Sequence, residues 1–164
     1  MSLCLGLRAG LLLGLLRAMW MAVEHLLGCR TAHLEWVEPS YDTFLLAGTP
    51  LVWVMLWRSN RRVHDLSPPK RSQPLTAGLV AGLVSGIIHV ATFAIYTEWL
   101  NPHFLDAFIA WNVEHSLNTL DVANREFHLP AFLDILLIHP MLFNPIVASL
   151  LTHVLPKFWP NAQN

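Results

Sequence analysis

The sequence predicts an all-α fold, an integral membrane four-helix bundle, on three observations. The 164-residue chain is 54% hydrophobic and only 13% charged, whereas soluble domains carry about 25% charged residues. It contains four apolar segments that approach, with their flanks, the roughly 20 residues of a membrane helix. Its basic residues gather on one side of those segments, as the positive-inside rule requires. We therefore expect a single transmembrane domain over residues 1–164.

The first span is predicted over residues 8–28, with an apolar run that begins by Leu3. A basic residue followed by an apolar run also fits a signal peptide, but no clean A-x-A-like cleavage site follows this one. We therefore expect a retained helix. Cys4 and Cys29 would lie about 40 Å apart at its two ends, too far for a disulfide between them.

The other three spans differ in length and composition. The second, over residues 43–59, is short and reaches membrane length only with its flanks. The third, over residues 75–97, is rich in glycine. The fourth, over residues 131–155, contains Pro140 and Pro145. Prolines are tolerated in membrane helices when neighbouring groups satisfy the freed carbonyls, and they often kink the helix.

A surface helix is predicted over residues 102–126, between the last two spans. The segment is too polar to span a membrane. Ring-bearing and aliphatic residues recur in it at helical spacing: Phe104, Phe108, Trp111, His115 and Val122. This pattern favours a helix that lies along the outer membrane surface. Its polar face is acidic rather than basic, so a helix packed over the outer mouth of the bundle is an equally good interpretation.

Positive charge predicts the orientation of the bundle. Seven basic residues fall on one side: Arg8, Arg58, Arg61, Arg62, Lys70, Arg71 and Lys157. The other side has only Arg30 and Arg125, and it carries most of the acidic residues. We expect both termini and the basic connection between spans two and three to face the cytoplasm.

Small residues recur every four positions along spans one and three. AGLLLGLLRAMW (Ala9–Trp20) aligns without gaps to AGLVAGLVSGII (Ala77–Ile88) at an offset of 68 residues. The repeated small residues are Gly6, Gly10, Gly14 and Ala18 in the first span and Gly78, Gly82 and Gly86 in the third. Such stripes let helix backbones approach closely inside a membrane. We predict that the two spans cross stripe to stripe within two related helical hairpins; the alternative is that one stripe faces a partner chain.

The layout resembles small bacterial membrane proteins of the "domain of unknown function 4199" type. The resemblance covers nearly the whole chain and rests on the two N-terminal spans, the basic loop, the segment AGLVAGLVSG, the aromatic exit FAIYTEWLNPHFLDAF and the last span ending HVLPK. Asn101–Phe108 is its most specific part. It implies a four-helix protein of the bacterial inner membrane, and it supplies no activity, substrate or catalytic residue.

Seven polar residues are predicted inside the spans. Those placed near the midplane are Arg17, Ser85, His89 and His139, and those placed in the outer third are Glu24, His25 and Asp134. A charged side chain at the centre of a membrane costs about 2.5–3.5 kcal/mol. We therefore expect these residues to face the bundle and to find partners there.

Arg17 borders the glycine stripe of the first span. Residues seven apart in a helix differ by only about 20° around its axis, so Gly10, Arg17 and Glu24 share one edge. Arg17 and Glu24 are two turns apart, beyond the usual i,i+4 spacing of ion pairs. Asp134 is a second candidate acid, because an intramembrane carboxylate also needs a partner, and His25 could hydrogen-bond either acid.

The favoured function is a non-catalytic accessory or structural subunit that contacts the lipid bilayer and packs against other membrane proteins or itself. Two alternatives stay open: a small ion, proton or solute transporter that acts as a homo-oligomer, and a subunit that holds a haem or chlorophyll-type pigment through His89 or His139. Histidine is the usual axial ligand of haem iron, but a lone buried histidine is more often structural.

Catalysis, metal binding and nucleic-acid binding have little support in the sequence. No G-x-S-x-G, P-loop or dinucleotide-binding fingerprint occurs, so no enzyme is predicted. A metal site at His103, Glu114 and His115 is weak because the chain has no H-x-x-x-H or H-E-x-x-H spacing. No basic patch accompanies a nucleic-acid-binding motif.

Overall fold

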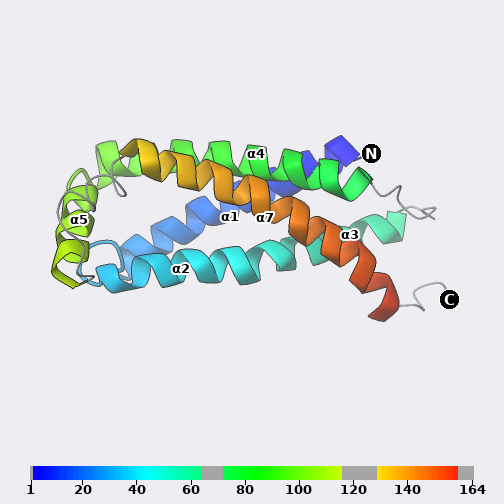
Figure 1. Ribbon diagram of the computed structural model, residues 1–164, viewed down its shortest axis with the longest axis horizontal. Coiled ribbons are helices and arrows are strands. Elements are labelled where there is room, and N and C mark those ends of the chain that lie inside the picture. The colour runs from blue at the N-terminus through cyan, green and yellow to red at the C-terminus, as the bar shows by residue number, and fades with distance from the viewer. Residues whose placement is uncertain (1, 64–71, 116–128, 159–164) are drawn as a thin grey trace.

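A computed structural model describes residues 2–63, 72–115 and 129–158, and every regular element in these ranges is helical. The helices run along the length of an elongated bundle (Figure 1). The starts of α1 (Ser2–Leu26) and α4 (Ser72–Ile95) lie at one end, together with the end of α7 (Leu129–Phe158). We call this the N-terminal end. A short helix, α5 (Phe104–His115), lies across the opposite end, which we call the α5 end.

α1 and α4 approach closely through the glycines of α1. A Cβ atom added to Gly6 would stand 2.5 Å from the carbonyl oxygen of Ala77, and one added to Gly14 would stand 2.7 Å from Ile88. Gly10 meets Val84 in the same way, at 2.7 Å. The glycine stripe of α1 therefore packs against small and β-branched residues of α4, and not against its glycines.

The glycines of α4 face α7 instead. A Cβ atom on Gly78 would stand 2.4 Å from Pro145, and one on Gly82 would stand 2.4 Å from the carbonyl oxygen of Pro140. The predicted stripe-to-stripe crossing of spans one and three is therefore wrong. Consecutive residues of a helix differ by about 100° around its axis, so α4 presents alanines to α1 and, one position later, glycines to α7.

The second long helical run is continuous from Val37 to Val63 and has three parts. It begins as α2 (Val37–Thr43), continues through a π-helical turn at Phe44–Gly48, and ends as α3 (Thr49–Val63). The predicted span over residues 43–59 lies inside this run. The helix begins six residues earlier than that span, so the polar segment before it is also helical.

A proline explains the π-helical turn. The backbone N–H of Thr49 donates to the carbonyl oxygen of Phe44, five residues earlier, instead of four. The next residue is Pro50, which has no N–H and cannot continue the α-helical ladder. One wider turn before the proline accommodates this break without a sharp change of direction.

α4 also ends in a π-helical turn, Tyr96–Leu100, after which the chain reverses into α5. Phe104 and Phe108 of α5 are buried, and their rings stack at a centroid distance of 5.7 Å. The predicted surface helix therefore packs its aromatic face onto the end of the bundle. The prediction extended this helix to residue 126; residues 116–128 lie outside the described part of the chain.

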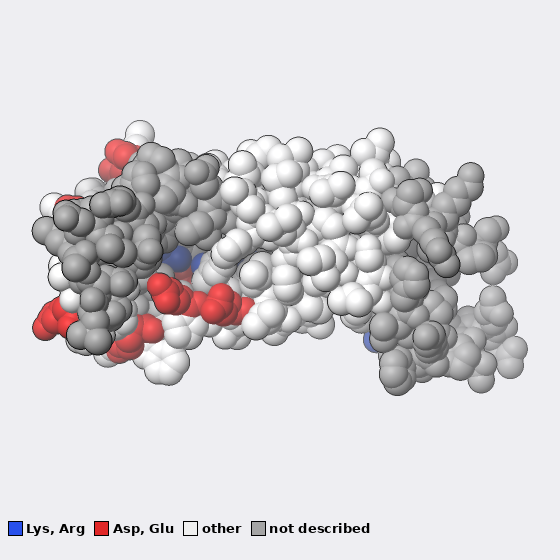
Figure 2. All heavy atoms as spheres, viewed as in Figure 1, with Lys and Arg blue, Asp and Glu red and all other residues white. Residues whose placement is uncertain are grey.

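Two helical stretches, Leu3–Leu26 and Gln73–Leu100, are long and apolar enough to cross a membrane by length and composition. A shorter apolar stretch, Leu136–Leu151, lies in α7. Figure 2 shows the acidic side chains gathered toward the α5 end on the visible face, with a broad uncharged surface over the middle of the molecule. On this face, the acidic side chains and the uncharged surface therefore occupy different parts of the bundle along its axis.

Candidate functional site

The site begins with a tight turn after α1. The backbone N–H of Cys29 donates to the carbonyl oxygen of Glu24, and that of Gly28 donates to His25. These two bonds form a Schellman motif, which requires a left-handed residue at its C′ position. Gly28 supplies it with a φ of +78°. Because the turn reverses the chain, Arg30 lies back against the helix that it has just left.

Glu24 is the centre of a buried ionic cluster. Arg17 Nη1 lies 3.0 Å from Glu24 Oε1, and Arg30 approaches Oε2 through both Nε and Nη2 at 2.7 Å. The three side chains are 2–4% exposed. Ser40 of α2 donates its hydroxyl to Glu24 Oε1. We call Arg17, Glu24, Arg30 and Ser40 the Glu24 cluster.

Arg17 and Glu24 do pair, although their separation exceeds the usual i,i+4 spacing of ion pairs. Seven residues rise about 10.5 Å along a helix, but the two side chains share one edge of α1 and are both long. The guanidinium of Arg17 reaches toward the α5 end, and the 3.0 Å contact results. Residues seven apart can therefore pair in a buried site where no closer partner competes.

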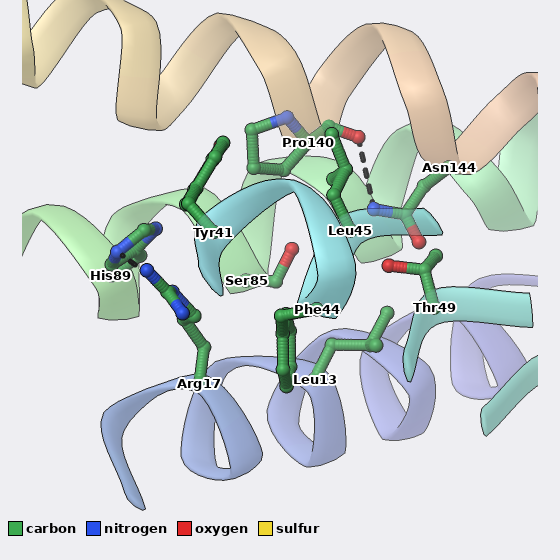
Figure 3. Close-up of a pocket in the computed structure, with 10 residues that line it drawn as sticks. All are labelled: Leu13, Arg17, Tyr41, Phe44, Leu45, Thr49, Ser85, His89, Pro140 and Asn144. Atoms are coloured by element: carbon green, nitrogen blue, oxygen red, sulfur yellow. Dashed lines mark hydrogen bonds between the residues drawn. The ribbon is translucent and has the colours of Figure 1, made fainter. Parts of the chain in front are cut away.

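Arg17 also contacts aromatic and imidazole rings. Its guanidinium carbon lies 4.9 Å from the centroid of Tyr41 and 5.4 Å from that of Phe44, distances at which cation–π attraction operates. Its Nε donates to His89 Nε2 over 3.4 Å (Figure 3). Because arginine can only donate, the proton of a neutral His89 lies on Nδ1. This contact also uses the nitrogen that would otherwise be available to a metal or pigment.

Arg30 has a similar environment on the other side of Glu24. Its guanidinium carbon lies 5.3 Å from the centroid of Tyr96 and 5.1 Å from that of Phe104. Asn101 donates from its side-chain amide to the carbonyl oxygen of Arg30. The hydrogen bonding of the Arg30 guanidinium is incomplete, because its Nη1 atom is buried and has no hydrogen-bond partner among the described residues.

Beside the cluster, Tyr96 joins two helix ends. Its hydroxyl lies 2.9 Å from His25 Nδ1, with which it shares a hydrogen bond, and it accepts another from Asn101 at 3.0 Å. His25 and Tyr96 also meet edge to face at 5.5 Å. These contacts fix the end of α1 to the π-helical turn that ends α4.

A cavity of about 240 Å³ opens beside the Glu24 cluster. Its polar lining residues are Arg17, Arg30, Glu38, Tyr41, Asp42, His89 and His139, and its apolar lining residues are Val37, Phe93, Phe108 and Leu136. The hydroxyl of Tyr41 is buried and, like Arg30 Nη1, has no hydrogen-bond partner in the described ranges. We call this space the arginine cavity. Figure 2 shows arginine atoms at the bottom of a hollow with acidic side chains at its edge.

A second, smaller cavity of about 20 Å³ lies deeper in the bundle and shares Arg17, Tyr41 and His89 with the first. Its lining residues, drawn in Figure 3, come from α1, from the continuous run of α2, π-helical turn and α3, and from α4 and α7. Asn144 of α7 accepts from Trp53 Nε1 at 2.9 Å and donates to the carbonyl oxygen of Pro140. This volume is close to the space that one water molecule needs.

The structure brings together only part of the predicted polar set. Arg17, Glu24, His25 and His89 lie in or beside the cluster, whereas Ser85 is buried and donates to Gly82 of its own helix. His139 is exposed at the cavity wall, where its ring lies 6.3 Å from Tyr41. The side chain of Asp134 lies outside the described part of the structure.

The weak metal site has different surroundings. His103, Glu114 and His115 are exposed, and His115 donates to the carbonyl oxygen of Trp111 and stacks on its ring at 4.9 Å. Within residues 2–63, 72–115 and 129–158, no three histidine, cysteine or acidic side chains gather in a way that could hold a metal ion.

Arg30, Ser40 and Tyr41 were not predicted to belong to the site. Arg30 was placed in a connection on the outer side, and Ser40 and Tyr41 preceded the predicted second span. A signal for Arg30 does exist in the sequence. It follows Glu24 after a glycine that can reverse the chain, and a buried carboxylate needs a cation.

Comparisons with known proteins give no relative. No family model, curated protein or solved structure matches this chain. The resemblance to the bacterial four-helix proteins therefore stays a prediction, and the function must be argued from the residues themselves.

Proposed function

We propose that the protein is a multi-pass protein of the bacterial inner membrane, with four spans and both termini in the cytoplasm. The apolar surface of the bundle carries this proposal. Large hydrophobic side chains that are 40–65% exposed recur along α1, among them Leu3, Leu7, Leu11, Leu15 and Met19. Similar residues recur on α4 and α7, among them Leu79, Ile87, Leu142, Ile146 and Leu150. In water such a continuous surface would cause association, whereas lipid solvates it.

The two native cysteines provide a direct test of this topology. Cys4 lies near the start of α1 and Cys29 just after its end, so a membrane crossing by α1 would separate them. In intact cells, a membrane-impermeant maleimide should label Cys4→Ser, which keeps only Cys29. It should label Cys29→Ser only after permeabilisation. Equal labelling of both single-cysteine variants in intact cells would exclude the proposed crossing.

The proposed role is that of a non-catalytic accessory or structural subunit. The outward face of α1 supports it, because this helix packs mainly on α4 and leaves a long apolar face uncovered. The glycine stripes do not add support, since the stripe of α1 packs against α4 and the stripe of α4 packs against α7 of the same chain. Purification in mild detergent after crosslinking should recover a partner or a second copy. A stable lone monomer would count against this role.

A second candidate, a small-solute or ion carrier, is favoured by the arginine cavity. The cavity is lined by two buried arginines together with apolar side chains. Flux into vesicles should disappear in Arg17→Leu or Asp134→Leu variants whose helical content and melting curve are retained. Undiminished flux in both folded variants would remove the carrier hypothesis.

Pigment binding through His89 or His139 has a simpler test. An absorption spectrum of the protein purified from its native membrane should show a visible band if a haem or chlorophyll-type group is bound. A spectrum that shows only the near-ultraviolet band of the aromatic side chains would exclude pigment binding.

A further inference from the structure

We infer that the arginine cavity binds a small monoanion that combines an oxyanion with a compact apolar body. The inference does not require the accessory role. It assigns a ligand to a site whose carrier function is a separate question, because binding without flux is a possible result.

The first argument is the charge of the buried cluster. Arg17 and Arg30 share the single carboxylate of Glu24, and all three side chains are almost fully buried. One positive charge is therefore left without a buried partner within the described residues. A buried charge is costly unless it is paired, and a bound anion would supply the missing partner.

The second argument is a pair of unused hydrogen-bond donors. Arg30 Nη1 and the Tyr41 hydroxyl are both buried, both residues line the cavity, and neither atom has a partner in the described ranges. Buried polar groups in folded proteins nearly always have partners. A carboxylate or phosphate oxygen accepts from both guanidinium and phenol groups, so one oxyanion satisfies both.

The third argument limits the charge and shape of the ligand. Glu38 and Asp42 also line the cavity, and both side chains are exposed. Their negative charge disfavours a polyanion. Val37, Phe93 and Leu136 line the same cavity, and these side chains suit an apolar group. The volume of about 240 Å³ exceeds what a single water needs and admits a small organic molecule.

The test uses the full chain in nanodiscs of phosphatidylcholine, titrated with benzoate by isothermal calorimetry. Benzamide has the same shape without the charge, and inorganic phosphate has the charge without the apolar body. Benzoate should bind at least about tenfold more tightly than either, the factor expected for a charge-assisted hydrogen bond. No benzoate binding, or equal binding of benzamide, would overturn the inference.

Two variants identify the donors without removing the ion pair. Tyr41→Phe deletes only the unused hydroxyl and should weaken benzoate binding about fivefold. Arg30→Lys keeps a cation for Glu24 but loses the forked donor, and it should weaken binding about tenfold. Tyr96→Phe is the matched control, because its hydroxyl is already bonded to His25 and Asn101 and it does not line the cavity. Unchanged affinity in both cavity variants would place the anion elsewhere and overturn the assignment.

The same chemistry has two sources, a soluble carboxylate and the phosphate of an anionic lipid. Repeating the titration in nanodiscs that contain phosphatidylglycerol separates them. If a lipid phosphate enters the site, the apparent benzoate affinity falls in wild type and the fall is lost in Tyr41→Phe. If the site takes soluble anions alone, affinity stays the same in both membranes. Either result supports the site and identifies the source of its ligand.

Discussion

The two halves of α4 are built on opposite principles. Toward the N-terminal end, Gly78 and Gly82 bring its backbone against α7 at distances that leave no room for a side chain, and Gly86 lies close to Leu137. Toward the α5 end, the same helix carries His89 and Phe93, which line the arginine cavity. In Figure 1, α1 diverges from α4 toward the α5 end. Small residues let the helices pack closely along one half of the bundle. A polar site can form only beyond them, where the helices lie farther apart.

This comparison predicts different costs for substitutions in the two halves. In the polar half, the cost of a substitution should follow the number of buried partners that it leaves unpaired. In the close-packed half, it should follow the contact distance at the substituted position. The predictions below run from the largest expected effect to the smallest.

Glu24→Gln should have the largest effect. It removes the carboxylate that Arg17 and Arg30 share, so the two buried cations lose their common acidic partner among the described residues. Removing one partner of a buried ion pair costs about 3–5 kcal/mol. Denaturation of the detergent-solubilised protein, followed by circular dichroism, should show this loss. The control is Glu35→Gln, since Glu35 is about half exposed and faces His33 at 3.4 Å; its change should stay within about 0.5 kcal/mol.

Gly82→Ala tests the close-packed half. The new methyl group would stand 2.4 Å from the carbonyl oxygen of Pro140, so α4 and α7 must move apart. Overpacking costs about 1–3 kcal/mol, partly offset by the better helix propensity of alanine.

Gly48→Ala is the matched control for this prediction. Its nearest neighbour is the Phe44 ring at 3.4 Å, an ordinary contact distance. It should leave stability unchanged or raise it by up to about 1 kcal/mol. Equal destabilisation by both substitutions would mean that glycine flexibility, and not contact distance, decides the cost.

Asn144→Leu tests a polar contact inside the close-packed half. It leaves Trp53 Nε1 without its acceptor in a buried position, at a cost of about 1–3 kcal/mol. Adding Trp53→Phe removes the unpaired donor as well. The double variant should therefore be more stable than the sum of the two single changes by about 1 kcal/mol. Strict additivity in the same unfolding assay would show that the hydrogen bond contributes nothing.

The two tyrosines give the smallest and most selective contrast. Tyr96→Phe removes a hydroxyl that is bonded to His25 and Asn101, and stability should fall by about 1 kcal/mol. Tyr41→Phe removes a buried hydroxyl without a described partner, and stability should not fall. A comparable loss in both variants would show that the hydroxyl of Tyr41 is satisfied in solution.

Much of the helical layout was predictable, because it depends on periodicity and hydropathy along the chain. The helical class and the two stretches that are long and apolar enough to cross a membrane follow from runs that the sequence displays directly. The early start of the second long run at Val37 was not predictable in this way. Its first turns carry polar residues that are helical because the Glu24 cluster engages Ser40 and Tyr41 lies against Arg17.

The site was only partly predictable for a related reason. Placing Arg17 against protein rather than lipid required only the helical wheel, and the residue is 4% exposed. Arg30 required knowledge of the turn at Gly28, and the stripe of α4 required knowledge of which neighbour each face meets. The first depends on a local turn that places Arg30 back against α1, and the second is decided by contacts between helices far apart along the chain.

The sequence by itself determined the helical class, the two helices that are long and apolar enough to cross a membrane, and which residues are too polar to be left in an apolar environment. These properties depend on local backbone preferences and on the free energy of transfer of single side chains. Only the tertiary structure decided that Glu24 pairs with two arginines, that the glycines of α4 serve α7, and that a cavity remains beside Tyr41. Packing assigns one neighbour to each helix face, and no local pattern specifies which neighbour it will be.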